Sequence, residues 1–372
     1  MRSKKTLLKA SPSGSFRPTL IVVLVAVVAA ATVVLQANLS AKQTSSSTAK
    51  PAPADQCVLK NDITYTCYKN ELTTAVNRVG PEQATAIVKA QYEKVPYVKT
   101  QCHQLMHAIG RAALIKHGDL GQTYVHGDHF CASGYFHGAS EEIIKEKGAD
   151  YIVQKADSVC DTFAKSRPYA LDHYNCVHGL GHGFMEAQDG ELFRSLQACD
   201  SLTGSWQQSS CYSGVFMQNI MIAQSPDESI NHTSRYLKTD DPMYPCDAVE
   251  AKYKSGCYII QTSWALQQVG YDYTKVFWLC DALNETNLRV ICYQSLGRDV
   301  SGAQLNDVNK VISTCNLGGT PEARSNCFIG AAKDFVYTFH SDKQAYVLCG
   351  KLPVDIKPTC DSTVKSYYAT FN

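Results

Sequence analysis

The sequence predicts an all-α protein, an α-solenoid-like stack of helical hairpins with a period of about 35 residues, linked by disulfides within each repeat. The first observation is an even number of cysteines, 16, all of which lie after residue 56. The second is that the amino-acid sequence around the last cysteines repeats. The third is that helix-start signals recur between neighbouring cysteines, such as Thr320 followed by Pro321.

The N-terminal part predicts a membrane anchor. Residues 1–18 are basic, and an uncharged apolar run follows at residues 19–37. A basic flank before such a run is typical of an N-terminus that stays in the cytoplasm while the following chain is exported. Because the run can span a bilayer and ends without a clean cleavage site, we favour an uncleaved signal-anchor over a cleaved signal peptide. Residues 38–56, rich in Ser, Thr, Ala and Pro, predict a flexible linker to a folded part outside the cytoplasm.

The cysteines of the exported part predict a disulfide framework in which neighbours along the chain are paired. The last five such pairs are separated by 12, 11, 12, 12 and 11 residues. Two earlier pairs, 102 with 131 and 160 with 176, are separated by 29 and 16 residues. A zinc–thiolate site is disfavoured because the sequence contains no C-x-x-C pair.

The repeated sequence predicts two helices in each repeat unit. "YDYTKVFWLCDAL" is typical of a first helix and "ARSNCFIGAAKDFVYTF" of a second, with Thr320 as the N-cap of the second. Each disulfide is then expected to link the end of one helix to the start of the next. Such a pair cannot bury its own apolar face, so stacked neighbours must share the burial. We expect these repeats over residues 195–372 and a histidine-rich helical part over residues 57–194.

Most histidines lie in the first units. Of 11 histidines, nine lie between His103 and His182. "CHQLMHAIG" and "CVHGLGHGFME" each hold two histidines four residues apart, a spacing that places both on one face of a helix. His137 and His182 are each followed four residues later by a glutamate. Six residues after the second cysteine of successive units stand His137, His182, Met217, Ser263, Arg298 and Lys333. The scaffold thus repeats along the chain whereas the histidines do not.

This contrast predicts a metal site rather than a structural role. The predicted metal ligands are His103, His107, His137, His178 and His182, and the candidates for a further ligand or a general base are Glu141 and Glu186. Zinc and copper are the first candidate metals, with Met217 or Met221 as a soft ligand for Cu(I), and iron and manganese come next. Haem held by two histidines is a less favoured alternative, and covalent haem is excluded because no C-x-x-C-H is present.

Other residues of this region have simpler interpretations. The glycines of "HGLGHG" weaken a helix, which predicts that another helix or a ligand approaches the backbone closely. The segment "IKHGDLGQTYVHGDHFC" is predicted to be a loop with solvated histidines at 117, 126 and 129. His173 is predicted to contact the ligands from behind.

Two functional hypotheses stay open. The first is a metal-dependent enzyme of the cell membrane that works outside the cytoplasm. The second is a non-catalytic module, either a solenoid that binds a protein or peptide and holds a structural metal, or a carrier for storage or delivery of haem or metal. Nucleic acid is not an expected partner because 35 basic and 34 acidic residues nearly balance. An open coordination position would distinguish a catalytic from a structural metal.

Overall fold

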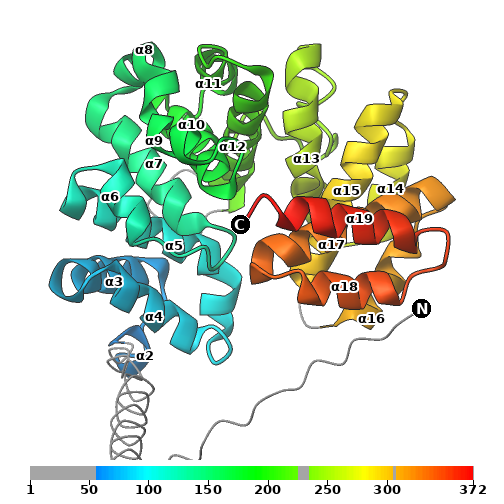
Figure 1. Cartoon of the computed structure of the whole chain (residues 1–372), viewed down its shortest axis with the longest axis horizontal. Helices are drawn as coiled ribbons and strands as arrows, with labels where there is room; N and C mark the ends of the chain where they lie inside the picture. Colours follow the sequence, from blue (N-terminus) through cyan, green and yellow to red (C-terminus); the bar gives the residue numbers. More distant parts are fainter. Residues whose placement is uncertain (1–55, 225–233, 305–306, 372) are drawn as a thin grey trace, which may run out of the picture. The chain divides into compact units, whose positions relative to one another are not determined.

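The computed structural model describes residues 56–224, 234–304 and 307–371. Each regular element in these ranges is a helix, which confirms the predicted all-α class (Figure 1). The predicted basic tail, membrane anchor and linker lie outside the described residues, except for Gln56 at the end of the linker. None of the described helices has both the length and the apolar character needed to cross a bilayer.

Longer and shorter helices alternate along most of the described chain; the exceptions are the two shorter helices α8 and α9 and the two longer helices α12 and α13, which follow one another. The longer ones are α3 (Tyr65–Val79), α5 (Pro96–His117), α7 (Gly134–Lys147), α10 (Leu171–Ala187), α12 (Ser205–Gln224), α13 (Ala251–Gln268), α15 (Thr286–Ala303), α17 (Pro321–Phe339) and α19 (Lys357–Tyr368). The shorter ones are α2 (Gln56–Leu59), α4 (Pro81–Gln91), α6 (Leu120–Val125), α8 (Ala149–Val159), α9 (Asp161–Ser166), α11 (Leu192–Cys199), α14 (Tyr273–Asp281), α16 (Val308–Cys315) and α18 (Lys343–Gly350). Each longer helix packs against the next longer one (Figure 1), so successive helices share the burial of apolar side chains. The period of about 35 residues stays a prediction from the sequence.

All 16 cysteines are paired with their neighbours along the chain, in eight disulfides, which confirms the predicted framework. In one of the five later pairs, Cys246 lies in a turn before α13; in the other four, the first cysteine lies near the end of a shorter helix and the second lies inside the following longer helix. Cys280 in α14 is linked in this way to Cys292 in the second turn of α15. Such a dense framework indicates an oxidising environment outside the cytoplasm.

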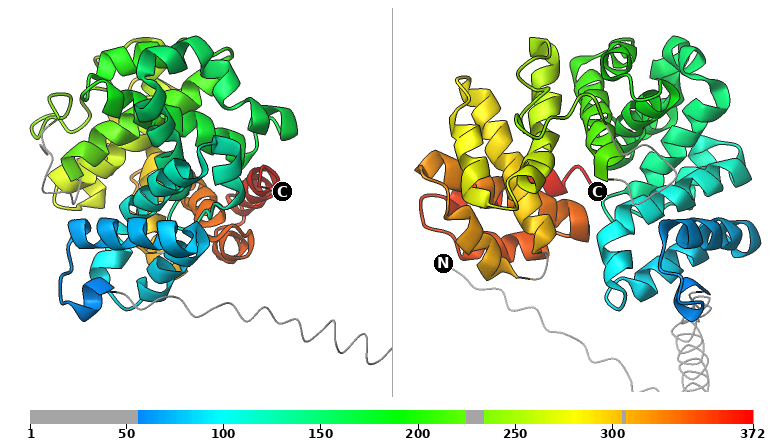
Figure 2. Two further views of the ribbon diagram at one scale, coloured as in Figure 1. Left: turned by 90° about the vertical axis from the view of Figure 1, so that its left-hand side faces the viewer. Right: turned by 180° about the vertical axis from the view of Figure 1, so that it is seen from behind.

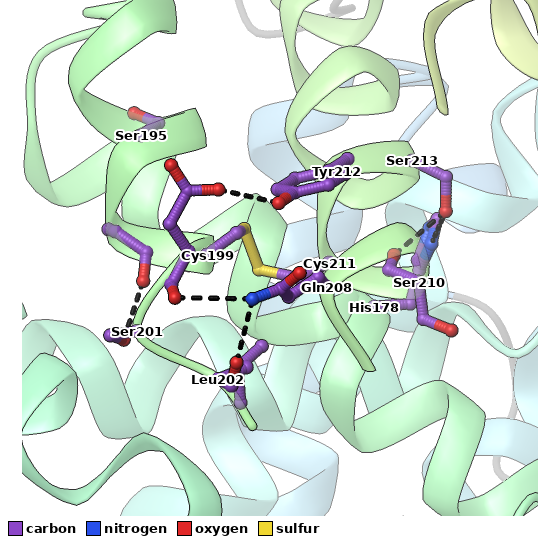
Figure 3. Close-up of a disulfide and its surroundings, with 12 residues drawn as sticks. His178, Ser195, Cys199, Ser201, Leu202, Gln208, Ser210, Cys211, Tyr212 and Ser213 are labelled. Atoms are coloured by element: carbon purple, nitrogen blue, oxygen red, sulfur yellow. Dashed lines mark hydrogen bonds between the residues drawn. A yellow bond between two sulfur atoms is a disulfide. The ribbon is translucent and has the colours of Figure 1, made fainter. Parts of the chain in front are cut away.

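A tyrosine–aspartate contact accompanies some of these disulfides. The Tyr212 hydroxyl donates to Asp200 Oδ1 at 2.5 Å, beside the Cys199–Cys211 disulfide (Figure 3). The hydroxyl of Tyr293 donates to Asp281 at the same distance. Each contact joins the residues that directly follow the two cysteines of a pair. The helix pairs are therefore held together by a covalent link and by a charge-assisted hydrogen bond.

The predicted start of α17 is confirmed in detail. Pro321 is the first residue of the helix, and the Thr320 side chain accepts a hydrogen bond from the Ala323 N–H at 3.1 Å. Proline suits this position because the first N–H groups of a helix have no partner within it. The N-cap hydroxyl satisfies another of these N–H groups.

Glycines let the helices of the first half approach one another at their backbones. A Cβ atom at Gly181 of α10 would lie 2.1 Å from the Cys211 carbonyl oxygen of α12. A Cβ atom at Gly138 of α7 would lie 2.2 Å from the His107 carbonyl oxygen of α5. The close approach predicted from the glycines is therefore made by helices. Gly297 and Gly330 serve the same purpose in the later helices, each 2.0 Å from a carbonyl oxygen by the same measure.

The C-terminal helices contact the first half of the molecule (Figure 2). The Tyr337 hydroxyl of α17 donates to the Ala132 carbonyl oxygen at 3.1 Å. The Leu171 N–H, at the start of α10, donates to the Thr370 carbonyl oxygen at 3.2 Å. These contacts place the C-terminal part of the chain against the start of α10 and against the residues just before α7.

Candidate metal centre

Three neighbouring helices bring the five predicted ligands together. His103 and His107 lie on α5, His137 on α7, and His178 and His182 on α10. They form two groups of three that share His137, and within each group one ligand atom per histidine lies within 4.8 Å of the others. The imidazoles of His107, His137, His178 and His182 are buried, and only that of His103 is partly exposed. The glycine contacts described above make this convergence possible.

The two pairs of histidines have the same internal geometry. On α5 the Nε2 atoms of His103 and His107 lie 3.0 Å apart. On α10 the Nε2 atoms of His178 and His182 lie 3.1 Å apart. Whether these contacts are hydrogen bonds depends on where the ring protons are, and the partners of the Nδ1 atoms decide this.

The Nδ1 atoms of the α5 pair face groups that can only accept. His103 Nδ1 lies 2.9 Å from the Cys131 carbonyl oxygen. His107 Nδ1 lies 3.0 and 3.1 Å from the two carboxylate oxygens of Glu141. Each Nδ1 must therefore carry a proton, since a carbonyl or an ionised carboxylate has none to give. In the neutral rings the Nε2 atoms of both residues then have free lone pairs.

The partners of the α10 pair accommodate the same tautomer by a different route. The Ser213 hydroxyl donates its proton to the Ser210 carbonyl oxygen at 2.8 Å, so its oxygen accepts from His178 Nδ1 at 2.9 Å (Figure 3). His182 Nδ1 donates to the Gln218 side-chain oxygen at 2.9 Å. Both Nε2 atoms are again unprotonated in the neutral rings.

Two unprotonated nitrogens at this distance repel one another unless a cation lies between them. Two nitrogens bound at about 2.0–2.1 Å to one tetrahedral ion are about 3.3 Å apart, close to the spacing of both pairs. In known metal sites, a ligating histidine usually donates its other ring N–H to a nearby acceptor, which orients the ring. The Nδ1 atoms of these histidines have acceptors of this kind. The cluster can thus hold a metal ion without a change of tautomer.

His137 gives independent support because both of its ring nitrogens are buried and lack a hydrogen-bond partner among the described residues. A buried polar atom without a partner costs about 1–3 kcal/mol. The ring faces both pairs, with centroids 5.4 Å from that of His103 and 4.8 Å from that of His178. A metal ion bound to His137 would remove this cost.

The electrostatic surroundings of four of these imidazoles favour the neutral form. Burial, reinforced by neighbouring histidines, lowers the pKa of His103 to about 3. Burial lowers the pKa of His182 to about 4. The pKa values of His137 and His178 lie well below the ordinary value for the same reason. Neutral imidazole is the form that binds a metal, so the centre is ready for metal at neutral pH.

The two predicted carboxylates lie at different depths. Glu141 is 1% exposed, and burial alone would raise its pKa. The Arg111 guanidinium, 2.7 Å from the carboxylate, and His107 instead hold this pKa below its usual range. Glu186 contacts Arg111 at 3.0 Å, and burial raises the pKa of its carboxyl. Glu141 therefore stands behind His107 as an ionised partner, while Glu186 lies further out on the same arginine.

Several functional neighbours were missed from the sequence. Arg111, Ser213 and Gln218 all fix ligands or their partners, and the Tyr174 hydroxyl lies 3.2 Å from His178 Nδ1. A signal for Arg111 was available, because it follows His107 by four residues just as Glu141 follows His137. Ser213 follows its cysteine by two residues, as His178 does, but a serine at that place predicts no metal chemistry.

The other histidines that the structure describes lie outside the cluster. The predicted loop after α5 is wrong in part, because Asp119 caps a short helix, α6, through a hydrogen bond to the Gln122 N–H. His117 and His126 stack at 4.8 Å, and His126 also pairs with Glu82. His129 and His173 contact other aromatic rings: that of His129 stacks on His340, and that of His173 packs on Trp206.

Comparisons with known proteins add no family to this picture. No protein-family model matches the chain. Searches among curated proteins and among solved structures likewise give no match. The functional argument therefore depends on the histidine centre, its partners and the disulfides.

Proposed function

We propose that the protein is a transition-metal-binding protein that works outside the cytoplasm, with the five histidines as ligands. The observation that carries this proposal is the orientation of the two histidine pairs. Each Nδ1 donates to a fixed acceptor, and the unprotonated Nε2 atoms stand 3.0 and 3.1 Å apart. A cation between the paired Nε2 atoms would remove the repulsion between their lone pairs.

The ligand set favours zinc or copper. All cysteines are in disulfides, so imidazole nitrogens are the available strong ligands. Iron and manganese prefer more oxygen ligands, and the Glu141 carboxylate is already bonded to His107 and Arg111. Haem is less suitable, because its two axial nitrogens would lie about 4 Å apart on opposite faces of the ring.

The cellular setting follows from the sequence and the disulfides together. The uncharged run at residues 19–37 supports a single-pass anchor in the cell membrane, and the eight disulfides support a folded part that faces an oxidising compartment. We assign Glu141 the role of orienting His107, not that of a general base, since its Oε2 atom already accepts hydrogen bonds from His107 and Arg111. A protein- or peptide-binding solenoid with a structural metal stays the alternative.

Elemental analysis of the full-length protein tests the proposal. The protein is purified without chelator or histidine tag and reconstituted with zinc, copper, iron or manganese. We expect at least one equivalent of bound zinc or copper. Two double variants, His103→Ala with His107→Ala and His178→Ala with His182→Ala, should lose metal and keep their helical content.

The matched control is the double variant His117→Ala with His126→Ala, which removes a pair of histidines that contact one another outside the cluster. It should bind metal as the unchanged protein does. If each ligand variant loses half of the metal, the two groups hold one ion each; if each loses all of it, they act as one site. An unchanged protein that binds none of the four metals would show that the proposal is wrong.

A further inference from the structure

A pocket of about 510 Å³ adjoins the histidine cluster. Residues of α5, α12, α13, α15 and α17 line it. The pocket therefore has walls from both the first and the second half of the described chain. His103 is the one predicted ligand in its lining, and it is also the one that is partly exposed. Access to the cluster from this pocket is therefore through the group of His103, His107 and His137.

The second group is closed on this side. His137, His178 and His182 are at most 2% exposed, and none of them lines the pocket. Three protein ligands with a fourth position open to a molecule from outside are typical of catalytic zinc sites, whereas structural sites are closed. The position of His103 thus gives the two groups different surroundings.

The residues that line the pocket indicate what kind of molecule would fit it. The charged side chains that line it have partners of their own: Lys99 pairs with Glu93 at 2.9 Å, and Arg298 pairs with Asp299 at 2.6 Å. The carboxylate of Asp334 accepts from the Ser301 hydroxyl at 2.5 Å. The other walls are largely apolar, among them Met217, Ile220, Met221, Ile260 and Leu266. A neutral molecule with an apolar body fits these walls better than an ion does.

On the basis of the proposed metal function, we infer that the ion held by His103, His107 and His137 keeps one coordination position open to this pocket. That position takes a neutral small molecule that has one nitrogen, oxygen or sulfur donor and an apolar body. The donor binds the ion, and the body packs against the methionines of α12 and the aliphatic side chains of α13. His178 and His182, which do not line the pocket, are out of reach of the same molecule.

The test uses the full-length protein loaded with Co²⁺ or Cu²⁺, whose visible absorption reports a change of ligands. The probes are imidazole, which supplies a donor alone, and 4-phenylimidazole, which adds an apolar ring. Because burial of a phenyl ring is favourable, we expect both probes to shift the spectrum and the phenyl derivative to bind at least about tenfold more tightly. Elemental analysis after the titration checks that the metal stays bound.

Two glycine variants connect the effect to the pocket. Gly302 lines the pocket, and a Cβ atom there would have no heavy atom within 4 Å. Gly302→Trp should fill the pocket and weaken binding of 4-phenylimidazole at least about tenfold, with metal content unchanged. Gly350 is a helical glycine with the same open space but outside the lining, so Gly350→Trp should bind the probe normally.

Failures of the two proposals are distinguishable. If the protein takes up no metal, the proposed function itself fails. If metal is bound but neither probe changes the spectrum, the open position does not exist. Equal affinity for the two probes, removal of the metal by the probe, or normal probe binding by Gly302→Trp would each overturn the inference.

Discussion

Replacement of Glu141 by glutamine tests the argument about ligand orientation most directly. Glu141 lies on α7 and contacts His107 Nδ1 from the side opposite to the Nε2 atom that faces His103. Glu141→Gln keeps the size of the side chain and an acceptor oxygen but removes the negative charge. The ring of His107 would then be a weaker base and a less firmly oriented ligand.

The expected magnitude follows from the role of such outer partners. Loss of a partner behind a metal-binding histidine typically lowers metal affinity about 10- to 100-fold, or about 1.4–2.7 kcal/mol. The lower part of this range applies here for two reasons. The glutamine oxygen can still accept from His107, and Arg111, which is 27% exposed, keeps its contact with Glu186. We therefore expect a loss of about tenfold to thirtyfold.

The assay is competition between the protein and a chelator of known affinity, for zinc or copper, at pH 7.5. Glu142→Gln is the matched control, because Glu142 lies on the same helix, is similarly buried and pairs with Lys145. Circular dichroism of both variants checks the helical content. Equal metal affinity of Glu141→Gln and the unchanged protein, or an equal loss in the control, would refute the orienting role.

Three further outcomes are expected. Since burial lowers the pKa of His182 to about 4, the metal-free protein should lose about 2 kcal/mol of unfolding free energy from this group between pH 6.5 and 5; denaturant titrations that show equal stability at both values would contradict a neutral buried ring. Gly181→Ala should destabilise the fold by about 1–3 kcal/mol because of the contact with the Cys211 carbonyl, whereas Gly302→Ala should be neutral or stabilising by up to about 1 kcal/mol; thermal unfolding of both variants compares them. Peptide mapping should find Cys280–Cys292, Cys315–Cys327 and Cys349–Cys360 linked and no free thiol under denaturing conditions, and links between distant cysteines would contradict the fold.

Much of the fold could be predicted from the spacing of the cysteines. A disulfide between residues a dozen apart can form only if the chain between them turns back, so regular spacing implies regular helix pairs. The Thr320–Pro321 signal likewise has a local cause, because it satisfies the first N–H groups of α17 without help from distant residues. Such features depend on neighbours in the sequence and can therefore be derived from it.

The sequence identified the histidines that the fold brings together, but not the residues that surround them. The spacing of His178 and His182 is a property of one helix, and the concentration of histidines in the first units is visible in the sequence. The partners of these rings come from another helix: Ser213 and Gln218 belong to α12. Their roles depend on how α10 and α12 pack, and that packing depends on backbone contacts at glycines, which sequence periodicity does not specify.

One position of the aligned units connects the centre to the pocket. The sixth residue after the second cysteine is a ligand candidate in two units, at His137 and His182, and it is a pocket wall at Met217, Ser263 and Arg298 in the following three. These residues come from α7, α10, α12, α13 and α15, so this position faces a common interior along successive helices. The residue at this position is thus a candidate metal ligand in the earlier helices and a pocket-lining residue in the later ones. The disulfide framework is similar in both. Helix α12 lies between the histidine cluster and the pocket. Its Ser213 and Gln218 contact the histidines of α10, and its Met217 and Met221 line the pocket. The described helices after α10 contain no histidine, and this agrees with the inferred arrangement, in which the space beside an open coordination position would accommodate a molecule and not a further ligand.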